Sequence, residues 1–225
     1  MKDLRKLTRA LGHEFAQAEL LEAALTHRSA GGRNNERLEF LGDAVLGLVI
    51  AEALFRRREA AREGALSRLR ASLVKRDTLA EIAQDLDLGA YLRLGVGEQR
   101  SGGFRRASIL ADALEALFGA IYLDGGFDAA RATVLLLYEA RLEDLPAAAD
   151  LKDAKTRLQE WLQGQGLALP RYDLVATDGQ AHAQTFTVTC TVDEPAGETR
   201  GQGPSRQRAE QDAAAQMLEK LSGED

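Results

Sequence analysis

The sequence has little cysteine and no long apolar stretch. Cys190 is the single cysteine among 225 residues, so the chain cannot form an internal disulfide. No apolar run reaches the roughly 18 to 20 residues that a membrane-spanning helix needs. The N-terminal segment also lacks the apolar core of a secretory signal. These absences argue against a disulfide-rich secreted domain and against an integral membrane protein. They predict a cytoplasmic protein with no membrane partner.

The sequence also lacks an excess of positive charge. It has 29 Lys and Arg residues against 35 Asp and Glu residues, which gives a net charge of -6. Both parts of the chain have more acidic than basic residues: residues 1–150 carry a net charge of -2 and residues 151–225 a net charge of -4. Neither part is globally basic. Any binding to a polyanion must therefore depend on local groups of cations.

β-Branched residues are sparse in the first 145 residues, where leucine and alanine recur at three- and four-residue spacing. This periodicity predicts amphipathic helices over residues 35–55, 67–86 and 109–123. The pattern lapses at Pro-Ala-Ala-Ala-Asp, residues 146–150, which indicates a linker. We therefore expect an all-α domain over residues 1–147 and a linker over 148–154.

The remaining residues, 155–225, have a different character. Residues 184–192 alternate between apolar side chains and threonine, as in a half-buried strand. Helices are expected at 155–163 and 205–221, with further strands at 171–177 and 198–202. The second domain is thus predicted to be a small α+β domain of order α-β-β-β-α. Cys190, on the apolar face of its strand, and Trp161 are expected in its core.

Acidic residues recur on one face of two of the predicted helices. Glu36, Glu39 and Asp43 are spaced i, i+3 and i+7, and Asp112 and Glu115 are spaced i and i+3. The other face of the first helix carries apolar side chains that are expected in the core: Leu38, Leu41, Val45 and Leu48.

Stacked carboxylates repel one another by roughly 1 kcal/mol per pair in water and roughly 4 kcal/mol near a protein surface at about 4 Å. A bound cation removes this repulsion, and carboxylate oxygens favour magnesium or manganese over zinc. A solvated acidic helix face would produce the same spacing. The spacing alone leaves these two interpretations open.

The acids of the first predicted helix lie within a longer sequence pattern. Asn-Glu-Arg-Leu-Glu-Phe-Leu-Gly-Asp at residues 35–43 resembles the signature of the ribonuclease III family. Residues 24–29, 102–106 and 109–117 agree with the same family. The C-terminal part resembles a double-stranded-RNA-binding domain. The resemblance covers nearly the whole chain and indicates an all-α nuclease domain followed by this binding domain.

The resemblance implies roles for particular residues. It implies four metal-binding carboxylates, of which Asp43 and Glu115 are also the catalytic residues: Glu39, Asp43, Asp112 and Glu115. Glu36 and Glu63 match secondary acids of the cleavage valley, and Phe40 matches a contact with a partner subunit. Ordinary core packing is the alternative for Phe40. His27, which precedes the signature, is expected to cap or support the local structure.

The resemblance also implies an activity. We expect a magnesium-dependent homodimeric endoribonuclease, in which manganese can substitute, that hydrolyses phosphodiester bonds of double-stranded RNA. Its products should have 5′-phosphate and 3′-hydroxyl ends with short 3′ overhangs. The expected substrates are ribosomal RNA precursors and some messenger and transfer RNA precursors.

Three RNA-contact zones are implied for the second domain. They are a helix with Thr156, Gln159 and Glu160, a loop with His182, and a helix start with Ser205, Arg206 and Arg208. Shape-based contacts to minor grooves and phosphates suit such an arrangement. The third zone departs from the family pattern, because Gln207 and Glu210 stand where lysines are common. The second zone departs from it too, with Gln180-Ala181 where a proline is common.

Two other functions fit parts of the sequence. A non-catalytic RNA-binding scaffold of the same fold should have lost some of the acids, and this chain keeps all of them. A helical phosphohydrolase of small nucleotides would explain the acids. It would not explain the α-β-β-β-α domain.

Overall fold

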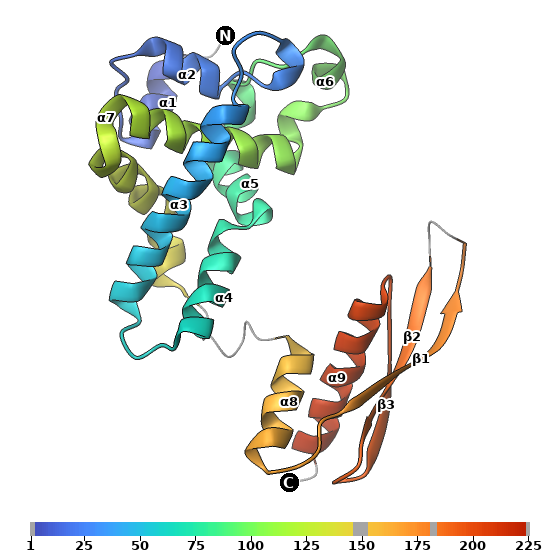
Figure 1. The fold of residues 1–225 in the computed structure, drawn as a ribbon. Coiled ribbons are helices and arrows are strands. Elements are labelled where there is room, and N and C mark those ends of the chain that lie inside the picture. Colours follow the sequence, from blue (N-terminus) through green and yellow to red (C-terminus); the bar gives the residue numbers. More distant parts are fainter. Residues whose placement is uncertain (1–2, 146–152, 181–183, 224–225) are drawn as a thin grey trace. The chain divides into compact units, whose positions relative to one another are not determined.

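The computed structural model describes residues 3–145, 153–180 and 184–223 of the chain. The chain divides into two compact units, Met1–Leu151 and Lys152–Asp225, each with its own hydrophobic core (Figure 1). None of the helices in the described ranges is long and apolar enough to cross a membrane.

The first unit is all-α, as predicted: the regular elements of its described residues are helices, and Thr26 and Arg93 form an isolated β-bridge between loops. Its α-helices are α1 Leu4–Leu11, α2 Ala18–Ala24, α3 Glu36–Arg57, α4 Glu63–Val74, α5 Arg76–Asp85, α6 Val96–Arg100 and α7 Ala107–Glu143. Short 3₁₀ turns occur at Arg28–Ala30, Leu88–Ala90 and Gly103–Arg105.

Two of the predicted helices differ from those observed. The pattern over residues 67–86 predicted one helix, but α4 and α5 are separate because Lys75 has an extended backbone with ψ 153°. Helix α7 continues well beyond residue 123 to Glu143 and bends at Gly126, where φ is 79°. A left-handed conformation of this kind is open to glycine at little steric cost. The apolar periodicity of the sequence continues past Gly126, so the pattern does not predict the bend.

Helices α3 and α7 cross at the centre of the first unit (Figure 1). The apolar face of α7 is buried, with Leu110, Leu114, Leu117 and Ile121 all in the core. On α3, Leu38 and Val45 are buried, whereas Leu41 is half-buried. The prediction that Leu48 lies in the core is wrong, because its side chain is 58% exposed. Apolar residues on α3 extend around more of the helix than the core of one chain covers.

The second unit has the predicted order α-β-β-β-α. Its elements are α8 Ala154–Gly164, β1 Arg171–Asp178, β2 Thr185–Val192, β3 Gly197–Gly203 and α9 Arg206–Ser222. The strands form an antiparallel sheet of order β1-β2-β3, in which Cys190 pairs with Tyr172 and Thr199. Both helices pack on one face of this sheet (Figure 1). Cys190 is buried in the core, as expected, whereas Trp161 is only half-buried and packs against that core.

Candidate active site

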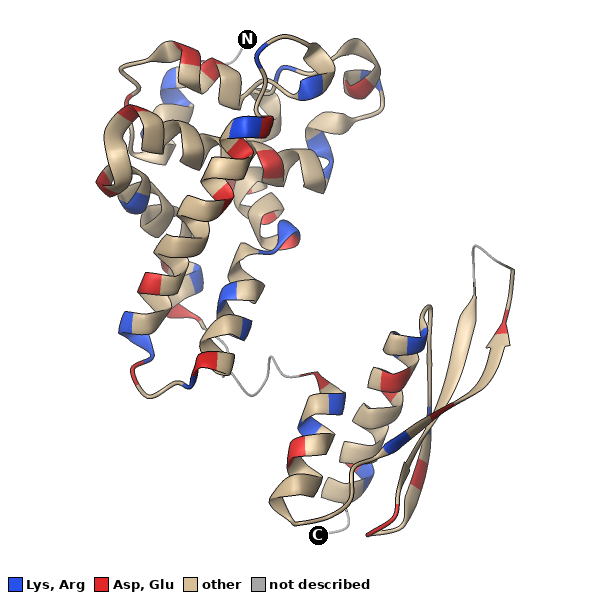
Figure 2. Ribbon diagram, in the orientation of Figure 1, with Lys and Arg blue, Asp and Glu red and all other residues tan. Residues whose placement is uncertain are grey.

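The crossing of α3 and α7 is unusually close because both helices have glycine at the contact. A Cβ atom on Gly42 would fall on the carbonyl oxygen of Glu115, and one on Gly119 would fall on that of Leu38. The two backbones therefore touch. Acidic segments of the two helices consequently gather where the helices cross (Figure 2).

Three of the four predicted metal ligands come together at this crossing. Carboxylate oxygens of Glu39, Asp112 and Glu115 all lie within 4.8 Å of one another. Asp43 is exposed and stands outside this group of three, yet its negative charge acts on Glu115. The acids that sequence spacing placed on two separate helices therefore form one cluster, with Asp43 at its margin.

The cluster is electrostatically strained without a cation. Burial raises the pKa of Glu115 to about 8, and the charges of Asp43, Glu39 and Asp112 contribute to the same rise. Burial also raises the pKa of Glu39 and of Asp112. Like-charged carboxylates in a partly desolvated site hold protons more tightly, and a divalent cation would favour their ionised forms. The donor set is all oxygen, so it fits a hard cation such as magnesium or manganese.

A cavity of about 470 Å³ adjoins the cluster. Glu39 and Asp112 line it, together with Arg28 and Arg106. Most of its lining is polar, with Ser108 adding a hydroxyl at the start of α7. Acids, cations and a hydroxyl around one open space are the groups needed to hold a phosphodiester beside a metal.

The two arginines of this cavity are held by acids. Arg106 Nη1 lies 2.6 Å from Glu98 Oε1, and Arg28 Nη1 lies 3.6 Å from Glu36 Oε1. The sequence pattern indicates no role for Glu98 or Arg106, although the string over residues 102–106 includes Arg106. Their pairing joins α6 to the start of α7 and depends on the fold, so residue spacing could not reveal it.

His27 combines a structural role with a place at the site. Its Nδ1 accepts a hydrogen bond from the backbone N–H of Ser29 at 3.2 Å and so caps the turn Arg28–Ala30. This confirms the capping role expected for it. His27 also lines the cavity beside the acids.

The two secondary acids occupy different places. Glu36 lines the cavity and its charge contributes to the raised pKa of Glu39. Glu63 lies at the start of α4, where it accepts a hydrogen bond from Ser67 Oγ at 2.7 Å and lies near Phe55 at the far end of α3. Within one chain, Glu63 therefore does not join the carboxylate cluster.

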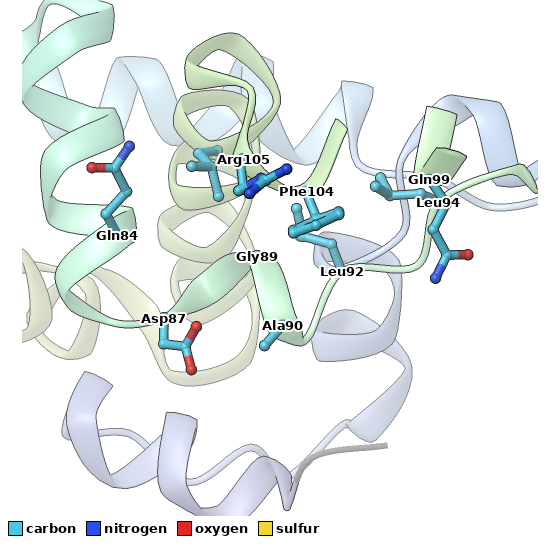
Figure 3. Close-up of a pocket in the computed structure, with 10 residues that line it drawn as sticks. Gln84, Asp87, Gly89, Ala90, Leu92, Leu94, Gln99, Phe104 and Arg105 are labelled. Atoms are coloured by element: carbon cyan, nitrogen blue, oxygen red, sulfur yellow. The ribbon is translucent and has the colours of Figure 1, made fainter. Parts of the chain in front are cut away.

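A larger cavity, of about 610 Å³, has a different lining (Figure 3). Leu92, Leu94, Phe104 and Leu110 line it, and the Arg105 guanidinium lies 5.0 Å from the centre of the Phe104 ring. It contains no acid of the carboxylate cluster. Although this cavity is the larger of the two, the smaller one is the better candidate for the active site, because acids of the carboxylate cluster line it.

The predicted RNA-contact residues lie on the second unit. Gln159, Glu160, Arg206 and Arg208 are exposed, and Thr156 is half-buried. Ser205 is the N-cap of α9 and accepts a hydrogen bond from the backbone N–H of Arg208 at 3.3 Å. His182 lies outside the described residues.

Comparison with known proteins places this arrangement in a class. Residues 17–141 match the family model described as Ribonuclease-III-like, and residues 154–221 match the double-stranded RNA binding motif. Together with the carboxylate cluster, the two matches define a nuclease that binds double-stranded RNA. The chain belongs to the ribonuclease III family and is an endoribonuclease.

Similar proteins cover nearly the whole chain. Ribonuclease 3 of Hahella chejuensis is 60% identical over 96% of this chain and 95% of its own length. Ribonuclease 3 of Alkalilimnicola ehrlichii is 59% identical over 94% of this chain and 92% of its own length. Among solved structures, a nuclease domain of ribonuclease III from Campylobacter jejuni is 47% identical with a TM-score of 0.59 and covers 61% of this chain and 97% of that one. That structure is described as flexible in a region involved in dimer formation.

Proposed function

We propose that Glu39, Asp43, Asp112 and Glu115 hold magnesium, with manganese able to substitute, and that the enzyme hydrolyses double-stranded RNA at this site. The observation that carries the proposal is the gathering of Glu39, Asp112 and Glu115 oxygens within 4.8 Å, together with the raised pKa of Glu115. Bound there, magnesium would lower the pKa of a coordinated water and offset charge on the phosphodiester.

The side chains around the cluster have distinct tasks in this proposal. Glu115, the most deeply placed acid, must lose its proton to serve as a ligand, since only the ionised form binds a hard cation well. Asp43, at the exposed margin, is placed to orient the attacking water. Arg28 and Arg106 orient the phosphodiester in the adjoining cavity. The products carry 5′-phosphate and 3′-hydroxyl ends with short 3′ overhangs.

We also propose a homodimer formed through the nuclease domain. Phe40 is 82% exposed, which is inconsistent with core packing, and Leu48 and Phe55 on the same helix are 58% and 70% exposed. Their spacing of eight and seven residues places them on one stripe along α3. A row of exposed apolar side chains of this kind indicates a protein interface. Glu63, at the start of α4, lies near Phe55 at the end of α3 and could reach a cleavage valley only in a second copy.

In the binding domain, we propose that Thr156, Gln159 and Glu160 face a minor groove and that the loop with His182 faces the next. Ser205, Arg206 and Arg208 would contact phosphates at the start of α9, where a helix N-terminus favours anions. The domain boundaries that we propose are residues 1–147 and 155–225, joined by 148–154. Ribosomal RNA precursors and some messenger and transfer RNA precursors, processed in the cytoplasm, are the proposed substrates.

A digest of long, perfectly paired RNA tests the catalytic proposal. Wild-type protein should cut in magnesium and stop cutting in EDTA. Glu115→Gln should bind RNA with unchanged affinity and cut at least a thousandfold more slowly, which is about 4 kcal/mol of lost transition-state stabilisation. Glu139→Gln is the matched control, because Glu139 is an exposed acid on the same helix. Cleavage by Glu115→Gln at the wild-type rate would contradict the proposed site.

A further inference from the structure

Glu210 of α9 lies between two cations of the binding domain. Lys155 Nζ lies 2.6 Å from its Oε2 atom, and Arg206 Nε donates a hydrogen bond to its Oε1 atom at 2.9 Å. Each carboxylate oxygen is therefore occupied by a different cation. The Glu210 side chain is 13% exposed, so water screens these pairs less than it would screen a surface pair.

Lys155 is held from several directions. Its ammonium also lies 4.4 Å from the centre of the Tyr172 ring, and its backbone N–H donates to Gln211 Oε1 at 3.1 Å. The ion pair with Glu210 thus joins the first turn of α8 to α9. An ammonium packed between an aromatic ring and a carboxylate has little freedom to turn towards an external phosphate.

The Glu210 carboxylate stays ionised at neutral pH and so continues to neutralise Lys155 and Arg206. Burial acts to raise the pKa of Glu210, but the hydrogen bonds from Lys155 and Arg206 outweigh it and the net shift is downward. Arg208 differs from these two cations, since it is exposed and forms no ion pair with any residue that the structure describes. Figure 2 shows the start of α9 as a mixed segment of basic and acidic residues.

We propose that Glu210 limits the affinity of this enzyme for double-stranded RNA by occupying Arg206, at the helix start that faces the RNA phosphates, and Lys155 beside it. The proposal rests on the proposed function, which assigns the start of α9 to phosphate contact. A phosphate must compete with the Glu210 carboxylate for both cations, so fewer counterions leave the RNA on binding. Arg208 then supplies the principal cation of this zone, and retention of substrate depends more on the nuclease domain.

Removal of the Glu210 charge tests this proposal in the full chain. The variants Glu210→Gln and Glu210→Ala are each combined with Glu115→Gln, so that binding to a perfect RNA duplex is measured without cleavage. The parent protein for comparison carries Glu115→Gln alone. At about 0.1 M salt, each double variant should bind the duplex about three- to tenfold more tightly than this parent. The slope of log affinity against log salt should become steeper by about one. Unchanged or weaker binding by these variants would overturn the proposal.

Two matched variants distinguish an effect of the position of the Glu210 charge from an effect of the net charge of the domain. Glu219→Gln removes one exposed carboxylate from the same helix and should change affinity less than twofold. Glu210→Asp keeps the charge and should bind like the parent protein. If Glu219→Gln tightens binding as much as Glu210→Gln, net charge alone is responsible and the proposal fails.

Folding and RNA binding of the parent complete the test. Thermal unfolding is recorded for each variant, and loss of the folded binding domain in both uncharged variants would overturn the proposal, because Glu210 would then be needed for folding. A parent protein that does not bind the duplex contradicts the proposed function. A parent that binds, with uncharged variants that bind no more tightly, contradicts only the role of Glu210.

Discussion

Gly42 of α3 faces Gly119 of α7 at the point where the two helices cross. A Cβ atom built on Gly42 would lie 2.9 Å from the backbone nitrogen of Gly119, and one built on Gly119 would lie 3.1 Å from that of Gly42. Gly42 is three residues from Glu39, and Gly119 is four residues from Glu115. This backbone contact is therefore what allows acids of two different helices to gather at the site proposed for the cation.

A methyl group at this crossing should disrupt both the fold and the site. Gly42→Ala must push the helices apart, since its Cβ would meet backbone atoms that cannot rotate away. We expect a loss of about 3 kcal/mol in the free energy of unfolding, measured by urea denaturation, together with a large loss of cleavage. Gly97→Ala is the control, because a Cβ there has no neighbour within 4 Å. Equal stability of the two variants would contradict this account of the crossing.

The raised pKa of Glu115 predicts a pH-dependent stability in the absence of divalent metal. An unfolded glutamate has a pKa of about 4.3, whereas Glu115 in the folded protein has a pKa of about 8. Between these values the folded state binds a proton that the unfolded state has lost, so stability falls as pH rises. The contribution is fully present below about pH 4.3 and is lost as pH rises through about 8.

This linkage can be measured by thermal unfolding in EDTA from pH 6 to 9. The midpoint of the wild-type protein should fall more steeply with pH than that of Glu115→Gln, which has no proton to lose. Addition of magnesium should stabilise the wild-type protein increasingly as pH rises, because the ionised cluster binds the cation. Parallel pH profiles for the two proteins in EDTA would show that Glu115 does not titrate in this range.

Arg106 is predicted to orient the phosphodiester beside the acids. Arg106 lines the cavity that Glu39 and Asp112 share, and the 2.6 Å ion pair with Glu98 holds its guanidinium. Arg106→Gln should lower the cleavage rate of bound RNA by about tenfold to a hundredfold, measured in single-turnover experiments. Arg100→Gln, an exposed arginine of α6, should cut within twofold of the wild-type rate. Equal rates for the two variants would remove Arg106 from the site.

Phe40 is predicted to lie at the subunit interface. With 82% of its side chain exposed in one chain, Phe40→Asp should leave the fold intact but place an unpaired charge in a buried interface. We expect a monomer at micromolar concentration by sedimentation, with cleavage greatly reduced. Val96→Asp is the control, because Val96 is also an exposed apolar residue of the nuclease domain. A dimer that persists in Phe40→Asp would place the interface elsewhere.

The sequence by itself determined the local structure and the chemistry of the candidate ligands. The alternation over residues 184–192 identified a strand, and the spacing of Asp112 and Glu115 placed both acids on one helix face. Both inferences succeed because strand and helix periodicities are properties of neighbouring residues. The string over residues 35–43 by itself indicated the ribonuclease III family.

Only the tertiary structure decided how distant residues meet. Leu48 has the spacing of a core residue, yet it is exposed, since periodicity along a helix does not show how much of that helix the core covers. The group formed by Glu39, Asp112 and Glu115 depends on the contact between Gly42 and Gly119, and the pairing of Lys155 with Glu210 depends on how α8 packs on α9. Such contacts are set by packing between helices rather than by spacing along one, and for that reason the tertiary structure alone decides which carboxylates gather and which are held by cations.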